Sequence, residues 1–269
     1  MGPSGRKAVT MQEILECAVG AARAAGKMLL NKFETVHPVE KTKNNLVTEA
    51  DLECEEAIVE AVRKDFPGHS ILAEERRTGA DVLSDHLWII DPLDGTNNYA
   101  HTIPHFCVSI AYAEAGKPLV GVVYDPVRNE FFSSVKGKGA FLNGKRIEAS
   151  RTKNVTESII TTGFYYDRGK LMERTLASIH SLFNADIRGI RRLGSAALDL
   201  CWVACGRFDG YFEYQLSPWD FAAGMLLVKE AGGTCIDREG RELGLTSKSV
   251  VASNGKIHDE FFRIVGWRE

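Results

Sequence analysis

One short stretch determines the predicted fold and chemistry of this chain, Asp91-Pro92-Leu93-Asp94-Gly95-Thr96-Asn97. It follows the apolar run Leu87-Trp88-Ile89-Ile90, which predicts a strand that ends at the Asp-Pro step. Two carboxylates then lie at the strand's carboxyl end, beside the backbone amides of Gly95 and Thr96, which can hold an anion. Two such charges about 4 Å apart repel by roughly 4 kcal/mol at an effective dielectric near 20, so the pair needs a cation or a proton. The pattern indicates a divalent metal that holds a phosphate; acids that merely form a turn and cap a helix are the alternative.

A second acidic position lies in the stretch Ser217-Pro218-Trp219-Asp220-Phe221-Ala222-Ala223-Gly224. The stretch opens an apolar helix that runs to Gly232-Gly233, which places Asp220 in the first helical turn. A capping or dipole role is the simpler interpretation of an acid at that position. A metal-ligand role is the alternative.

Together these two stretches resemble the inositol monophosphatase family, whose signatures are D-P-[IL]-D-G-T-x-N-[FY] and W-D-x-A-A-G, the second followed by an apolar helix that ends in E-A-G-G. The matching segments here are 91–99, 219–224 and 230–233. Two further segments, 70–75 and 46–51, resemble the family's glutamate pair and its L-V-T-x-x-D element. These elements occur in the family's order, and the resemblance runs from about the first helix to the last strand.

The hydrophobic periodicity predicts a mixed α+β / α/β chain. Helical spacing indicates a helix over 10–33, which opens with the capping box Thr10-Met-Gln-Glu13, and another over 48–66. Leu30 is among the apolar positions of the first helix and Leu52 among those of the second. Residues 106–142 read as an antiparallel sheet with an Asn143-Gly144 hairpin. Beyond residue 151 strands and helices alternate. The resemblance implies a layered α-β-α-β-α sandwich of the sugar phosphatase type. We expect two lobes of one catalytic unit: 1–150, an α+β lobe with an antiparallel sheet and most metal ligands, and 151–269, an α/β lobe with Asp220 and the substrate pocket.

Composition excludes several classes of function. The 269 residues carry 33 basic and 36 acidic side chains, so the charge favours neither nucleic acid nor an anionic membrane as partner. No run of 18 apolar residues and no signal-peptide pattern is present, which predicts a cytoplasmic protein. The six cysteines form no C-x-x-C pair; Cys201 and Cys205 could touch on one helix, but reduced thiols are favoured.

The resemblance implies a role for each acid of the predicted metal site. The implied cofactor is Mg²⁺, two or three ions per site, and oxygen ligands suit this cation. One ion would be held by Glu74, Asp91 and the Leu93 carbonyl, and a second by Asp91, Asp94 and Asp220. Glu74 and Thr96 would orient the attacking water, with Asp91 between the ions. The Gly95 and Thr96 amides would hold phosphate oxygens.

Six further positions bear on substrate binding. Glu213 matches a hydroxyl-binding position of the family, with an exposed strand-end glutamate as the alternative, and Gly194 and Ser195 match the backbone that meets the substrate ring. Three arginines precede Gly194: Arg188, Arg191 and Arg192. They are expected either to bind a second phosphate of the substrate or to lie at the surface, where they are solvated or pair across a subunit contact.

The resemblance implies metal-dependent hydrolysis of a phosphate monoester, foremost myo-inositol monophosphate, with inhibition by lithium and assembly as a homodimer. Fructose 1,6-bisphosphate or another sugar phosphate is the nearest alternative, and 3′-phosphoadenosine phosphate and histidinol phosphate are less favoured. A regulatory protein that uses this fold to bind a macromolecular partner is the alternative from a different class.

Overall fold

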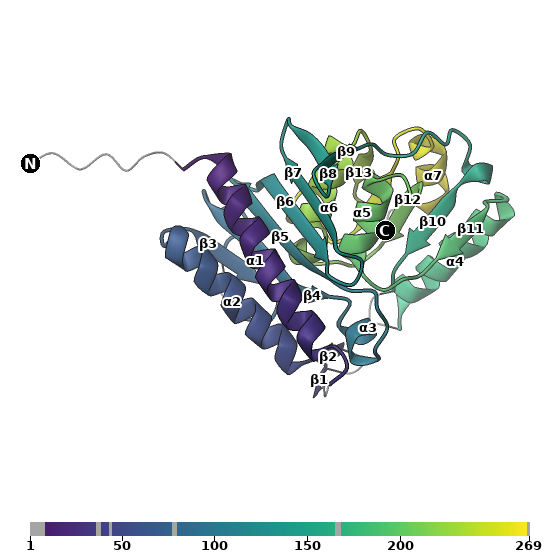
Figure 1. Ribbon diagram of the computed structural model, residues 1–269. Helices are drawn as coiled ribbons and strands as arrows, with labels where there is room; N and C mark the ends of the chain where they lie inside the picture. The colour runs from purple at the N-terminus through teal and green to yellow at the C-terminus, as the bar shows by residue number, and fades with distance from the viewer. Residues whose placement is uncertain (1–8, 36–38, 43–44, 77–79, 165–167, 268–269) are drawn as a thin grey trace, which may run out of the picture.

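The computed structural model describes residues 9–35, 39–42, 45–76, 80–164 and 168–267. None of the helices in this part of the chain is both long enough and apolar enough to cross a bilayer. The described chain forms five layers, helices alternating with two sheets (Figure 1).

Two helices form the first outer layer, α1 (Met11–Lys32) and α2 (Glu49–Asp65). Each begins with a capping box: Thr10 with Glu13 in α1, as the sequence predicts, and Thr48 with Asp51 in α2. The helices pack on each other and on one face of the larger sheet (Figure 1). Leu30 and Leu52, which the helical spacing assigns to the buried sides, are instead about two-fifths exposed.

The larger sheet has seven strands in the order β3-β4-β5-β6-β7-β8-β9. Their bounds are β3 Ser70–Ala73, β4 Leu87–Asp94, β5 Cys107–Glu114, β6 Lys117–Asp125, β7 Glu130–Val135, β8 Gly139–Leu142 and β9 Lys145–Ile147. The expected antiparallel arrangement holds from β4 to β9, but β3 runs parallel to β4. The predicted hairpin joins β8 and β9, and both Asn143 and Gly144 have positive φ.

Two helices of the carboxyl-terminal half, α5 (Ala196–Ala204) and α6 (Pro218–Glu230), lie between the sheets. α6 is apolar all round, as expected for a helix covered on every side. It approaches the larger sheet closely because Gly121 lacks a side chain: a Cβ there would lie 2.9 Å from the Ala223 carbonyl oxygen.

The smaller sheet has the order β11-β10-β12-β14-β13, and α4 (Lys170–Asn184) and α7 (His258–Val265) form the last layer. Its strands are β10 Ile159–Thr162, β11 Gly189–Arg191, β12 Gly210–Glu213, β13 Thr234–Ile236 and β14 Val250–Ser253. A hairpin of β1 (Val39–Thr42) and β2 (Asn45–Val47), the short helix α3 (Thr96–Ala100) and the turn η1 (Val155–Glu157) complete the described elements. The predicted layered α-β-α-β-α fold is confirmed, whereas the division into lobes at residue 150 stays a prediction.

Candidate active site

The site begins where β4 leaves its regular pairing. The strand does not end at the Asp91-Pro92 step, as predicted, but continues to Asp94 after an irregularity. Asp91 pairs with Ser109 and Asp94 with Cys107, so an irregularity separates the two acids. The Asp91 Oδ1 atom accepts the Leu93 amide at 3.0 Å. Gly95 follows with φ of 99°, and a Cβ there would lie 3.0 Å from the His105 carbonyl oxygen. The chain can therefore turn into α3 at this point only through glycine.

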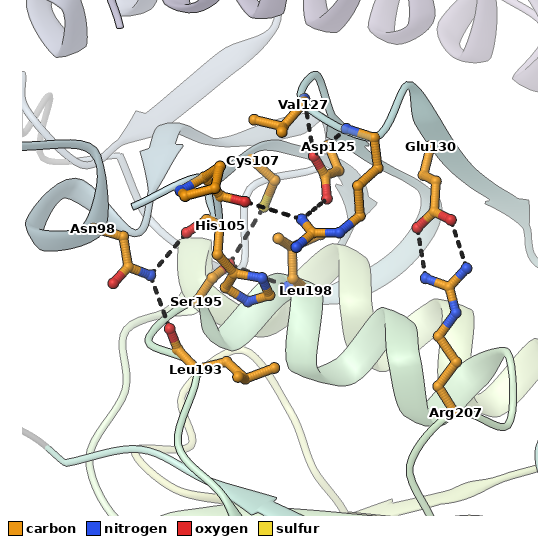
Figure 2. A network of polar contacts seen from close by, with 12 residues as sticks. Asn98, His105, Cys107, Asp125, Val127, Glu130, Leu193, Ser195, Leu198 and Arg207 are labelled. Atoms are coloured by element: carbon orange, nitrogen blue, oxygen red, sulfur yellow. Dashed lines mark hydrogen bonds and ion pairs between the residues drawn. The ribbon is translucent and has the colours of Figure 1, made fainter. Parts of the chain in front are cut away.

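Asp94 connects the two halves of the chain. Its Oδ2 atom accepts the Ser195 hydroxyl at 2.6 Å and the Ala197 amide at 2.7 Å, both from the start of α5. Asn98 makes a parallel connection: its Nδ2 donates to the carbonyl oxygens of His105 and Leu193, each at 2.8 Å (Figure 2). These bonds fix the segment before α5 against the loop that follows β4.

Asp220 is the third residue of α6, and its Oδ2 atom accepts the Ser217 amide at 2.6 Å as part of a capping box. The capping interpretation of Asp220 is therefore correct. It does not exclude a ligand role, because one carboxylate oxygen is enough for the cap and Asp220 also lines the cavity at the centre of the site.

A cavity of about 160 Å³ brings the predicted residues together. Glu74 reaches it from the end of β3, where its amide donates to Ile90 of β4 at 3.2 Å. The predicted site residues that line this cavity are Glu74, Asp91, Leu93, Asp94, Gly95, Thr96, Gly194, Ser195, Glu213 and Asp220. Residues from both halves of the chain thus face one space.

The acids of this cavity destabilise one another's charge. Burial, followed by the charges of Glu74, Asp94 and Asp220, raises the pKa of Asp91 well above its ordinary value. Burial and the charges of Glu74 and Asp94 likewise raise the pKa of Asp220. For Asp94 burial again raises the pKa, opposed by the hydrogen bonds from Ser195, Ala197, Ala196 and Gly95. A bound cation would remove this repulsion.

The donor set fits magnesium. Every candidate ligand offers oxygen, and Mg²⁺ usually takes only a few carboxylates and keeps several waters. In the described ranges no three His, Cys, Asp or Glu side chains are already gathered at metal-ligand spacing.

Thr96 has a neighbour that the sequence did not assign to the site. Its hydroxyl lies 3.0 Å from the Leu93 carbonyl oxygen and 3.2 Å from Asp51 Oδ1. Asp51 is buried, and its other oxygen accepts the Thr48 amide at 2.7 Å. With its proton directed at either acceptor, the Thr96 hydroxyl can accept a hydrogen bond from water. The segment 46–51 was the sequence signal that could have identified Asp51.

The substrate side of the cavity is built around Glu213. It is buried at the end of β12, and Oε2 accepts the Tyr211 hydroxyl at 2.7 Å, so the exposed strand-end interpretation is wrong. Burial raises the pKa of Glu213 to about 7, against the Tyr211 hydrogen bond and the charge of Arg192. A Cβ at Gly163 would lie 1.9 Å from Oε2, so this carboxylate needs glycine beside it. Sequence reasoning missed both Tyr211 and Gly163.

The three arginines do not act as one cluster. Arg192 lines the cavity near Gly194, whereas Arg188 and Arg191 are not among the lining residues. Arg191 directs its guanidinium to the Ile190 carbonyl at 3.0 Å. The six cysteines are all free thiols, as expected.

The fold and the acidic cavity define a phosphatase-type scaffold, and comparisons place the chain within it. The inositol monophosphatase family model matches residues 10–266, and the chain belongs to this family. It is 44% identical to Nus factor SuhB of Pasteurella multocida, over 93% of this chain and 94% of that one. It is 41% identical to inositol monophosphatase 1 of Solanum lycopersicum, over 94% of each chain. The inositol monophosphatase structure from Anabaena superposes with a TM-score of 0.86 at 42% identity, covering 95% of this chain and 96% of that one.

Proposed function

We propose that this protein hydrolyses phosphate monoesters in a Mg²⁺-dependent reaction and that its preferred substrate is a myo-inositol monophosphate. The observation that carries the proposal is the convergence of Glu74, Asp91, Asp94 and Asp220 on one cavity. The charges of Glu74 and Asp94 raise the pKa of both Asp91 and Asp220, and such repulsion between neighbouring acids does not stabilise a fold. They are typical of a site that is completed by cations.

The proposed ligands divide into two sets that share Asp91. Glu74, Asp91 and the Leu93 carbonyl would hold one ion, and Asp91, Asp94 and Asp220 the other, with two or three ions in all. Bound Mg²⁺ lowers the pKa of water and neutralises charge on phosphoryl oxygens.

The chain's own groups would position the reactants. Glu74 and the Thr96 hydroxyl orient the water, and Thr96 is fixed by Leu93 and Asp51. The Thr96 amide, at the first residue of α3, faces a phosphate oxygen. The Gly95 amide favours the charged form of Asp94 in the free protein and shares in phosphate binding when substrate enters.

Glu213 supports a polyol as the leaving group, because a carboxylate accepts hydrogen bonds from neighbouring hydroxyls. Its place at the cavity wall, held by Tyr211, suits recognition of the alcohol. Fructose 1,6-bisphosphate stays the nearest alternative, since Arg192 at the same cavity could contact a second phosphate.

Phosphate release from a panel of esters tests the proposal. Myo-inositol 1-phosphate should show the highest kcat/KM, above fructose 1,6-bisphosphate, a nucleotide 3′-phosphate and histidinol phosphate. Arg192→Ala serves as the discriminating variant: a selective loss on the bisphosphate would favour the sugar bisphosphatase alternative. Absence of release from every ester would overturn the phosphatase proposal.

The names of several relatives favour a second candidate function. The Pasteurella protein is called a Nus factor, so a role through a macromolecular partner is our second proposal. The retained acids weigh against a purely regulatory protein, because partner binding does not require them. Asp220→Asn separates the two roles: it should abolish turnover and leave partner binding intact. The family also leads us to expect a homodimer, which sedimentation equilibrium at micromolar concentration can test.

A further inference from the structure

Asp199 is a buried acid at the cavity that no role proposed above uses. It lies in the first turn of α5, where its amide donates to the Ser195 carbonyl at 3.0 Å. The residue is 1% exposed and lines the same cavity as Glu213 and Asp94. Its Oδ1 atom is buried and, among the residues that the structure describes, has no hydrogen-bond partner.

An unpaired buried carboxylate oxygen destabilises a fold unless something satisfies it. Burial raises the pKa of Asp199 well above its ordinary value, and nearby Asp94 and Glu213 add to this, while the Thr161 hydroxyl and Arg192 oppose it. An isolated structural role would supply a partner for Oδ1, as the chain does elsewhere. Asp209 is the contrast: it is also buried, but its oxygens accept the Ser150 hydroxyl at 2.5 Å and the Ile159 amide at 2.8 Å.

We propose that Asp199 is a specificity-determining residue whose carboxylate, after a small shift of the side chain toward the cavity, accepts a hydrogen bond from a hydroxyl of the substrate's alcohol. This inference rests on the proposed phosphatase function and narrows its substrate class. Glu213 on β12 and Asp199 on α5 offer acceptors from two different elements of the cavity wall. An alcohol with hydroxyls on several carbons, such as a cyclic polyol, satisfies both at once. An aryl or simple alkyl phosphate satisfies neither.

The test compares two buried aspartates with opposite surroundings, Asp199→Ala and the control Asp209→Ala. For Asp199→Ala we expect kcat/KM for myo-inositol 1-phosphate to fall about tenfold, mainly through KM, because a substrate donor loses its partner. Hydrolysis of 4-nitrophenyl phosphate should stay within about twofold. Asp199→Asn, which keeps an acceptor oxygen, should recover part of the loss. The melting temperature of Asp199→Ala should not fall, whereas that of Asp209→Ala should fall with unchanged kinetics.

A binding measurement separates failure of this inference from failure of the proposed function. Saturation-transfer NMR can follow myo-inositol with Mg²⁺ and inorganic phosphate, a mixture in which no turnover occurs. Inositol binding that is lost in Asp199→Ala would support the inference even if the wild type hydrolysed no ester. Either of two results for Asp199→Ala would overturn the inference: equal losses of activity on both esters, or a lowered melting temperature. It would also be overturned if the wild type did not bind inositol, or if Asp199→Ala bound inositol as the wild type does.

Discussion

The Ser195 hydroxyl donates to Asp94 at 2.6 Å across 101 positions of sequence, and the same oxygen caps α5 by accepting the Leu198 amide at 3.3 Å. One side chain therefore fixes both a predicted metal ligand and the start of the helix that carries Asp199. The site depends on this contact between the helix layer and the larger sheet.

Ser195→Ala should affect stability and activity together. Loss of the cap and of the charged hydrogen bond should lower the free energy of unfolding by about 1–2 kcal/mol. A freed Asp94 should also reduce kcat for inositol 1-phosphate by about tenfold. Thr10→Ala is the matched control, since it removes the capping box of α1 far from the cavity. For Thr10→Ala, urea unfolding should show a stability loss of about 1 kcal/mol, and phosphate release should show an unchanged kcat. An unchanged kcat in Ser195→Ala would contradict the positioning role of Ser195.

Gly163→Ala should displace the Glu213 carboxylate, because the added methyl group would lie 1.9 Å from Oε2. We expect kcat/KM for inositol 1-phosphate to fall about tenfold, as in Glu213→Gln, with 4-nitrophenyl phosphate nearly unaffected. If both substitutions act on the same contact, the double variant should lose little more than either single one. Additive losses in this cycle would show that Gly163 acts elsewhere.

Lithium should inhibit turnover, an expectation carried from the family, in which this cation occupies a magnesium position after catalysis. Asp91, Asp94 and Asp220, which the proposal assigns to that position, all face the cavity. Initial rates at rising lithium concentration and fixed Mg²⁺ measure the effect. An enzyme insensitive to lithium in the millimolar range would still be a phosphatase, but its second ion would be held differently.

His105 should make stability depend on pH. Burial, with the charge of Arg128, lowers its pKa from 6.5 to about 4. The unfolded chain therefore binds a proton that the folded one excludes, so stability is full above about pH 6.5 and falls as the pH drops toward about 4. Between neutral pH and pH 5, His105 should lower the free energy of unfolding by about 2 kcal/mol, in addition to the effect of other titrating groups. In urea unfolding His105→Gln should show a smaller decrease between pH 7 and 5; an identical decrease would exclude His105 as the cause.

Local signals in the sequence predicted most elements and the acidic cavity. Capping boxes, alternation and the Asn143-Gly144 turn are short-range patterns, and the acids of 91–94 and 220 lie at element ends where loops converge. β14 and α7 were not predicted, because β14 is only four residues long and inserts between β12 and β13, a placement that tertiary pairing decides.

The missed site residues share a physical reason. Asp199 reads as an ordinary helical residue, and only the packing of α5 between two sheets buries it. Gly163 follows β10 without a turn motif, and its need for glycine arises from Glu213, which lies 50 positions further along the chain. Leu30 and Leu52 show the converse, since apolar periodicity alone does not show which apolar positions of a helix stay exposed.

The central claim is that the four acids at the cavity form a divalent-cation site that drives hydrolysis. The most direct measurement is phosphate release from myo-inositol 1-phosphate by metal-free protein titrated with Mg²⁺, beside Asp220→Asn, with melting temperatures recorded on the same samples. For the wild type we expect no phosphate release before Mg²⁺ is added, then saturable recovery of release together with a rising melting temperature. Asp220→Asn should show neither response. Its metal-free form should be at least as stable as the metal-free wild type, because a repelling charge is removed. Full activity after exhaustive chelation, or a magnesium response that Asp220→Asn retains, would contradict the account.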